Sequence, residues 1–167
     1  SDSCTSRMPP ASRAGAVTRC DSGSICAGTI STLNSLIGGS DGDQAGSGGV
    51  IALPNGGYVV ASPFWDNGAL ANAGAVTWCA SAGGCASTIG AANSLLGGSA
   101  QDNVGSGRVI VLNSGNYVVD SPRWDNASGV NAGAVTWGSG VSGITGTVGP
   151  GNSLVGALAD DRADGFV

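Results

Sequence analysis

Short apolar segments separated by small polar turns follow one another along the chain. Residues 73–78, 87–96, 108–112 and 117–120 are apolar or β-branched segments, and residues 113–116, between the last two, read Asn-Ser-Gly-Asn. Segments of this kind, bounded by Gly, Asn and Ser, predict short β-strands joined by tight turns. No window of eleven or more residues shows the period of a helix. The pattern therefore predicts an all-β fold with four short strands in this stretch.

The same pattern returns with a fixed step of 59 residues. The string AGAVT begins at Ala14, Ala73 and Ala132, and Tyr58 recurs as Tyr117. A period of this length is typical of a supersecondary unit that cannot bury its apolar face alone. The chain is accordingly one repeat domain, 1–167, made of the tail of a partial repeat (1–13), repeat 1 (14–72), repeat 2 (73–131) and a partial repeat 3 (132–167).

An ordered set of short motifs runs through the repeats. Repeat 2 has Val-Gly at 104, Val-Ile-Val-Leu at 109, Tyr-Val-Val at 117 and Asp-Ser-Pro at 120, and Gly-Ala-Val follows at 133. This order resembles the integrin-α type FG-GAP repeat, and the chain is also similar to tandem repeats of long exported bacterial surface proteins. The resemblance implies β-propeller blades of four antiparallel strands each.

Calcium-binding FG-GAP repeats carry an Asp-rich loop between the last two strands. The corresponding residues here, 53–57 and 112–116, contain no carboxylate, so the charged oxygen ligands of a hard cation are missing. We therefore expect no metal and no other cofactor.

Fewer than three full copies are present, whereas a propeller ring needs about four to eight blades. A shorter run leaves open sheet edges. We expect either a homo-oligomer in which several chains close a ring, or a section of a longer array.

Charge and composition exclude several classes of function. Asp supplies all the acidic residues and Arg all the basic ones, His is absent, and the formal net charge is −5. Nucleic acid and anionic membranes bind clustered Lys and Arg, so neither is an expected partner. Without His and Glu the usual proton-transfer groups are missing, and we expect no enzyme. A hydrolase that uses Asp alone is the weakest alternative.

No stretch reaches the ~20 apolar residues that span a bilayer, and the first residues lack the pattern of a signal peptide. We expect a secreted or surface-exposed protein without membrane insertion, any export signal having been removed.

Four cysteines form two repeat-related pairs, Cys20 with Cys26 and Cys79 with Cys85. Repeat 3 lacks both members of the pair, having Gly138 and Ile144 in their places. Loss of both together is expected of two local disulfides in an extracellular protein. Two buried free thiols per repeat are the alternative. Cys4 has no repeat-related partner.

Two loops carry candidate ligand-binding residues: Trp65, Asp66 and Asn67 in one, and Arg123, Trp124, Asp125 and Asn126 in the other. An aromatic face beside a carboxylate and an amide suits a sugar, because the ring covers its C–H face and the polar pair takes its hydroxyls. The alternative is that the tryptophans pack between blades while Asp and Asn cap the turn. The two loops differ, since Phe64 replaces Arg123 in the first.

A second repeated position holds Asp43, Asp102 and Asp161. These carboxylates either cap turns or form a weak calcium site. Turn capping is favoured, because the copies differ in their neighbours and no EF-hand Glu is present.

The leading hypothesis is a non-enzymatic extracellular recognition module. Several weak rim sites would bind a glycan, as in a lectin, or a cell-surface protein, and their number would supply avidity. The alternative is a structural spacer or filament-like segment of a surface protein with no ligand of its own.

Overall fold

The computed structural model describes residues 12–20 and 27–163. Among these residues there are twelve strands and no helix, so the all-β prediction is confirmed. The strands are β1 (Ala16–Thr18), β2 (Ser35–Ile37), β3 (Gly49–Ala52), β4 (Tyr58–Ser62), β5 (Ala75–Cys79), β6 (Ser87–Thr88), β7 (Ser94–Leu96), β8 (Val109–Val111), β9 (Tyr117–Ser121), β10 (Ala134–Gly138), β11 (Gly146–Thr147) and β12 (Ser153–Val155).

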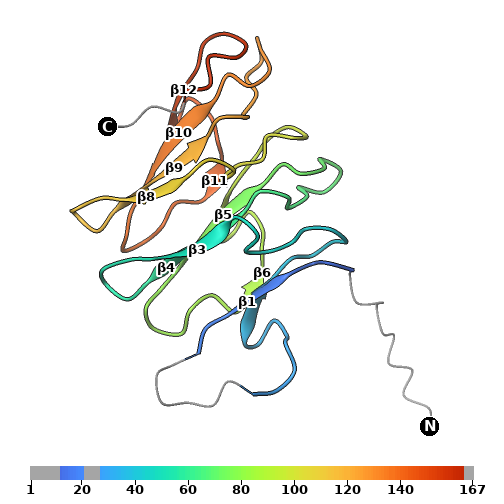
Figure 1. Cartoon of the computed structure of the whole chain (residues 1–167), viewed down its shortest axis with the longest axis vertical. Helices are drawn as coiled ribbons and strands as arrows, with labels where there is room; N and C mark the ends of the chain where they lie inside the picture. Colours follow the sequence, from blue (N-terminus) through green and yellow to red (C-terminus); the bar gives the residue numbers. More distant parts are fainter. Residues whose placement is uncertain (1–11, 21–26, 164–167) are drawn as a thin grey trace.

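The strands form three sheets that follow one another along the long axis of the molecule (Figure 1). The first sheet has the order β1-β2-β6, the second β3-β4-β5-β7-β11 and the third β8-β9-β10-β12. In the second sheet β3, β4, β5 and β7 are antiparallel neighbours, and the third sheet repeats this arrangement. Each four-stranded unit therefore takes two strands from one sequence repeat and two from the next.

A two-residue strand joins each of the first two sheets to the following repeat. β6 pairs with β2, and β11 pairs with β7, both in parallel. The sequence predicts a single strand over 87–96, but the structure divides this segment between two sheets. Asn93 causes the division, since its side chain accepts the Gly90 N–H and donates to the Thr88 carbonyl, both at 3.0 Å. The turn held by Asn93 sends β6 to the first sheet and β7 to the second.

The second sheet is buried on both faces. Neighbouring residues of a strand point to opposite faces, and accordingly Val59 and Ala61 of β4 join one core while Val60 joins the other. The first core, between the first and second sheets, contains Leu36, Ala45, Val60, Trp65, Ala75, Cys79, Ile89 and Leu96. The second core, between the second and third sheets, contains Leu53, Val59, Ala61, Val76, Leu95, Val104, Tyr117, Val119, Trp124, Ala132, Ala134 and Val148.

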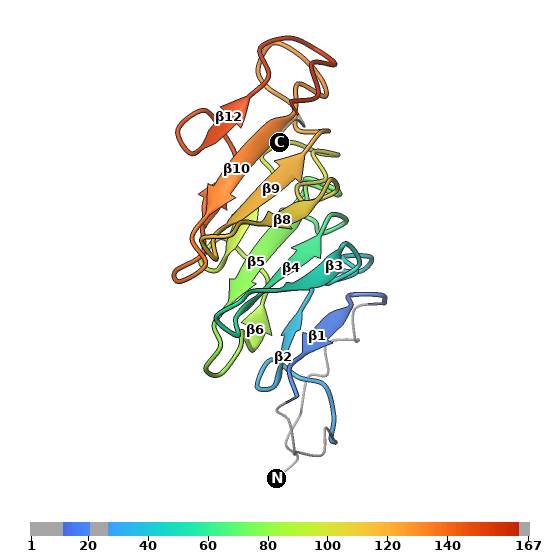
Figure 2. The same ribbon diagram turned by 60° about the vertical axis from the view of Figure 1, so that its left-hand side comes forward.

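Face-to-face stacking of the sheets is visible in Figure 2, where the third sheet lies at one end and the first at the other. No sheet of the described residues closes into a ring. Four-stranded antiparallel sheets match the content of a propeller blade, but the sheets are arranged as an open series. None of the described segments is a helix with the length and apolarity that a bilayer span requires.

The repeated AGAVT string needs its glycine. Gly74 has a φ of +81°, and a Cβ at this position would collide with the backbone nitrogen of Val104. The two residues form a parallel bridge, so the chain approaches itself here without room for a side chain. Gly15 and Gly133, at the same repeat position, have φ values of 71° and 77°.

Candidate functional site

Both candidate tryptophans are core residues. Trp65 is 7% exposed within the first core, and Trp124 is 6% exposed within the second. Each lies shortly after a Ser-Pro step. The backbone N–H of Trp65 donates to the Ser62 carbonyl, and that of Trp124 to the Ser121 carbonyl, both at 3.1 Å. Since protein atoms cover the rings, neither offers a free face on which a sugar could stack. Of the two interpretations left open by the sequence, the structure favours packing.

The polar partners of these tryptophans hold the surrounding loop. Asp66 accepts a backbone N–H of the same loop at 2.7 Å, and the Asn67 side chain donates to the Gly97 carbonyl at 3.0 Å. Asp125 and Asn126 make the same two bonds in the next repeat, each at 2.7 Å. The four side chains therefore position the turn between two strands of one sheet.

Asp43 and Asp102 join consecutive sheets. Asp43 is fully buried, its Oδ2 accepts the N–H groups of Gly39 and Ser40 at 2.7 and 2.8 Å, and its Oδ1 accepts the Asp66 N–H at 3.0 Å. Asp102, also fully buried, makes the equivalent three bonds at 2.8, 2.8 and 3.0 Å. Each carboxylate ties the turn after one sheet to the loop of the next, as the capping interpretation expects.

The electrostatics of this position can be followed at Asp102. Burial raises the pKa of Asp102 above its ordinary value of 3.8. Hydrogen bonds from backbone N–H groups stabilise the ionised form and oppose that rise, while the neighbouring Asp125 carboxylate adds to it. The pKa is raised because desolvation outweighs the donated bonds.

Asp161 occupies the same repeat position at the end of the third sheet. Its Oδ2 accepts two backbone N–H groups, from Ala157 and Leu158, at 2.9 and 2.8 Å. The third bond of Asp102 comes from a loop of the next sheet, between β9 and β10, and no sheet follows the third one in the described residues. Asp161 is exposed, whereas Asp102 is buried.

Arg123 is the exposed residue among the seven candidates, whereas the two tryptophans are buried and the other four are half-buried. Arg123 borders two shallow hollows of about 430 and 490 Å³. Its Nη1 donates to Asn103 Oδ1 at 3.3 Å, and Asn103 in turn donates to the Pro63 carbonyl at 2.9 Å. The smaller hollow is lined by Gln101, Asn103, Pro122, Arg123, Asn131 and Arg162. We call this hollow the Arg123 groove.

Sequence reasoning missed most of the Arg123 groove because its residues come from separate loops. The one signal in the sequence is the residue type, because Asn tolerates a left-handed backbone better than most residues, and Asn103 and Asn131 have φ values of 46° and 51°. Their repeat partners at 44 and 72 share this backbone conformation, so the signal marks loop geometry rather than a ligand. No group of three or more acidic, Cys or His side chains suited to a metal occurs among the described residues.

The cysteine prediction is confirmed for the second pair. Cys79 and Cys85 form a disulfide. Cys20 is also disulfide-bonded, while its expected partner Cys26 lies outside the described residues, as does Cys4. The bridge closes the loop between β5 and β6.

In the third sheet an aromatic ring fills the place that this disulfide has in the second sheet. Tyr117 pairs with Gly138 across β9 and β10, as Tyr58 pairs with Cys79 across β4 and β5. A Cβ on Gly138 would collide with the Tyr117 ring, which is fully buried. Burial raises the pKa of Tyr117 to about 12. The glycine thus makes room for a tyrosine that packs more deeply than its half-buried counterpart Tyr58.

These repeats match a known sequence family over most of the chain. The family is described as a repeat of unknown function (DUF5650), and its model matches three times, at residues 8–47, 52–106 and 111–165. The chain belongs to this family. No curated protein and no solved structure matches the chain. The three DUF5650 matches confirm the tandem repeats, and they assign no ligand or activity.

Proposed function

We propose that the chain is a structural spacer module of an extracellular repeat array. The observation that carries this proposal is the use of the repeated side chains. Trp65 and Trp124 fill the two cores, and Asp43 and Asp102 tie one sheet to the next. The residues that recur at equivalent positions therefore hold consecutive sheets together. A spacer needs such contacts between its units and no ligand site of its own.

The open series of sheets supports the same proposal. Sheets that follow one another along the long axis extend the chain in one direction (Figure 2). Each four-stranded sheet corresponds to the blade that the FG-GAP resemblance implies, and we interpret the blades as members of an array. The Cys79–Cys85 bridge suits an extracellular place, because disulfides persist in oxidising compartments. The proposal includes no catalysis.

Small-angle X-ray scattering tests the spacer proposal. We expect the scattering of a rod-like particle, with a long dimension that does not change with salt or with added sugars. A tandem fusion of two copies should lengthen the particle along the same axis. A compact particle, or a fusion that folds back on itself, would contradict the proposal.

A second candidate function is recognition of an acidic glycan or an acidic cell-surface protein. The observation in its favour is the Arg123 groove, where Arg123 and Arg162 are both exposed on a chain of net charge −5. Guanidinium groups bind carboxylates and sulfates. The exposed Gln101 offers an amide for hydroxyls at the edge of the groove. One such groove per chain gives weak binding, which an array would multiply.

A glycan array that carries acidic and neutral sugars tests the second candidate. We expect binding to acidic sugars only, lost in Arg123→Ala. Phe64→Ala is the matched control, because Phe64 occupies the same position one repeat earlier and is 40% exposed. Equal loss in both variants, or preference for neutral sugars, would contradict recognition by the groove.

A further inference from the structure

The outer face of the third sheet is a copy of a face that is buried elsewhere in the molecule. Leu154 is 68% exposed, whereas its repeat equivalents Leu95 and Leu36 are 0% and 1% exposed. Trp137 is 54% exposed, while the equivalent Trp78 packs against the second core. Together with Leu112, Val118, Val135 and Pro150 these side chains line a mostly apolar hollow of about 440 Å³, which we call the tail face.

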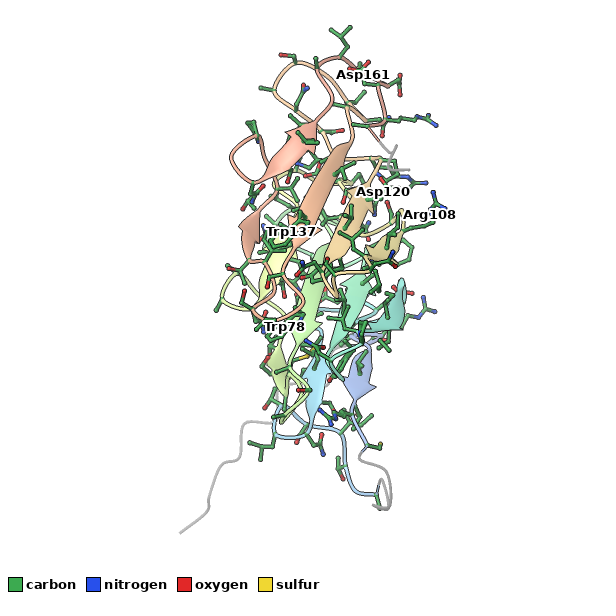
Figure 3. The ribbon with its side chains drawn as sticks, turned by 90° about the vertical axis from the view of Figure 1, so that its left-hand side faces the viewer. Trp78, Arg108, Asp120, Trp137 and Asp161 are labelled. Carbon is green, nitrogen blue, oxygen red and sulfur yellow. A yellow bond between two sulfur atoms is a disulfide. The ribbon has the colours of Figure 1, made fainter. Side chains whose placement is uncertain are left out.

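The second core shows what covers this type of face. Trp78 lies beneath the first loop of repeat 3: its Nε1 donates to the Gly140 carbonyl at 3.2 Å, and a Cβ on Gly143 would be 2.7 Å from the Trp78 Cβ. Figure 3 shows Trp78 and Trp137 following each other along one side of the stack, with Asp161 near its end. A tail-type face is thus covered, inside this molecule, by the next sheet and its loops.

The first sheet carries the complementary half of such an interface. Ile30 is 61% exposed, although its equivalents Ile89 and Val148 are each 4% exposed within the two cores. Ile37 and Ala16 are half-buried. In the second sheet the corresponding residues, Leu96 and Ala75, belong to the first core. We call Ala16, Ile30 and Ile37 the head face.

Backbone groups are complementary at the two ends as well. β7 accepts the parallel strand β11, and the Val148 N–H then donates to the Leu96 carbonyl at 2.9 Å. In the third sheet β12 has the position of β7, yet its outer edge is unpaired among the described residues. Residues 28–29 have the position of β11 and likewise pair with no described strand.

The unpaired segment of the first sheet already has the conformation of its paired equivalents. The Asn34 side chain accepts the Ser31 N–H and donates to the Thr29 carbonyl, both at 2.9 Å. Asn152 holds the turn after β11 with the same two bonds, each at 3.0 Å. Pairing at this edge therefore requires little further ordering of the turn.

We propose that copies of this chain associate head to tail. Residues 28–29 of one copy add in parallel to β12 of another, and Ile30 covers Leu154 and Trp137. Inside the molecule, each face equivalent to the tail face is covered by the face of the next sheet that is equivalent to the head face. The head face of a second copy is therefore the surface that we expect on the tail face. The contact joins two different surfaces, so it does not close at two copies. Continued in the direction in which the three sheets already follow one another, it produces open chains. The association goes beyond the spacer function, which a single chain could perform.

Sedimentation velocity of the purified chain over a wide range of concentrations tests the association. We expect the mean mass to rise steadily with concentration, without a plateau at two chains. A constant mass of one chain would overturn the proposal while leaving the scattering test of the spacer function unaffected. A plateau at two chains would overturn it also, since a symmetric contact would then join like faces.

Two substitutions sharpen the test. Leu154→Asp places a charge on the tail face, and Ile30→Asp places one on the head face; both residues are exposed in the single chain, so folding is retained. We expect each variant alone to sediment as one chain. Mixed in equal amounts, they should form pairs and nothing larger, because only one intact tail and one intact head remain.

Matched controls lie next to the two faces. Leu33→Asp alters the turn of the head and Val141→Asp a loop near the tail; these residues are 90% and 77% exposed. Their equivalents Ala92 and Ala82 stay exposed even where two sheets are stacked. We expect both controls to assemble as the unchanged chain does. Equal loss of assembly in the controls, or no pairing in the mixture, would overturn the head-to-tail geometry.

Discussion

The second and third sheets have equivalent sequences and different surroundings. Leu95 of the second sheet is fully buried, whereas Leu154 of the third is 68% exposed. Asp102 accepts three backbone N–H groups at the end of the second sheet, and Asp161 accepts two at the end of the third. The comparison teaches that the contribution of a repeated residue to stability depends on whether another sheet packs over it. This is expected of repeat proteins, in which stability comes from contacts between neighbouring units.

Of the changes considered, truncation of Leu95 should lower the stability of the chain most. We expect Leu95→Ala to lower the free energy of unfolding by about 3 kcal/mol, because it removes buried apolar atoms and leaves a cavity. Leu154→Ala should cost less than about 0.5 kcal/mol, as is usual for a surface position. Urea denaturation at low protein concentration measures both. Similar losses in the two variants would show that the two sheets are equally covered in the single chain.

Asp102 and Asp161 should show the same difference between a covered and an uncovered sheet, with a somewhat smaller loss of stability than at Leu95. Asp102→Asn replaces one acceptor oxygen by a donor, so at least one buried N–H loses its partner, at a cost of about 2 to 3 kcal/mol. Asp161→Asn should cost below about 1 kcal/mol, because water reaches this exposed site. Thermal and urea unfolding of the two variants should separate them. A larger loss at Asp161 would contradict the role of Asp102 as a tie between sheets.

Removal of the disulfide compares the Cys79–Cys85 bridge of the second sheet with the buried Tyr117 ring that takes its place in the third. The double variant Cys79→Ala, Cys85→Ala should lose about 2 kcal/mol, since the closed loop is short. The reverse change, Gly138→Cys with Ile144→Cys, should bring no gain, because the Tyr117 ring fills the space that a Cβ on Gly138 would need. Denaturation with and without reductant compares them. A stabilising bridge in the reverse variant would contradict the steric argument.

The pH dependence of stability should give the smallest effect. The pKa of Asp102 is raised in the folded chain, so the folded state binds the proton more strongly than the unfolded state. The resulting stabilisation is fully present below pH 3.8, the ordinary pKa, and is lost as the pH rises through the raised pKa of the folded chain. We expect this decline in the unchanged chain and its absence in Asp102→Asn. Identical pH profiles would contradict the assignment to Asp102.

The sequence by itself determined the all-β class, the step of 59 residues and the Cys79–Cys85 bridge. These features are local or periodic: alternation of residue types predicts strands, and a repeated spacing predicts repeated units. Even the possibility that Trp65 and Trp124 are packing residues followed from their recurrence. The split of residues 87–96 did not, because a strand of two residues has no pattern of its own.

Only the tertiary structure decided which residues are covered. Equivalent residues such as Leu95 and Leu154 are identical in the sequence, and burial depends on whether a neighbouring sheet lies over them. The same holds for the Arg123 groove, whose side chains come from separate loops and meet only after the sheets stack. The spacing of residues along a chain fixes local hydrogen bonds, whereas contact between sheets depends on side chains far apart in sequence.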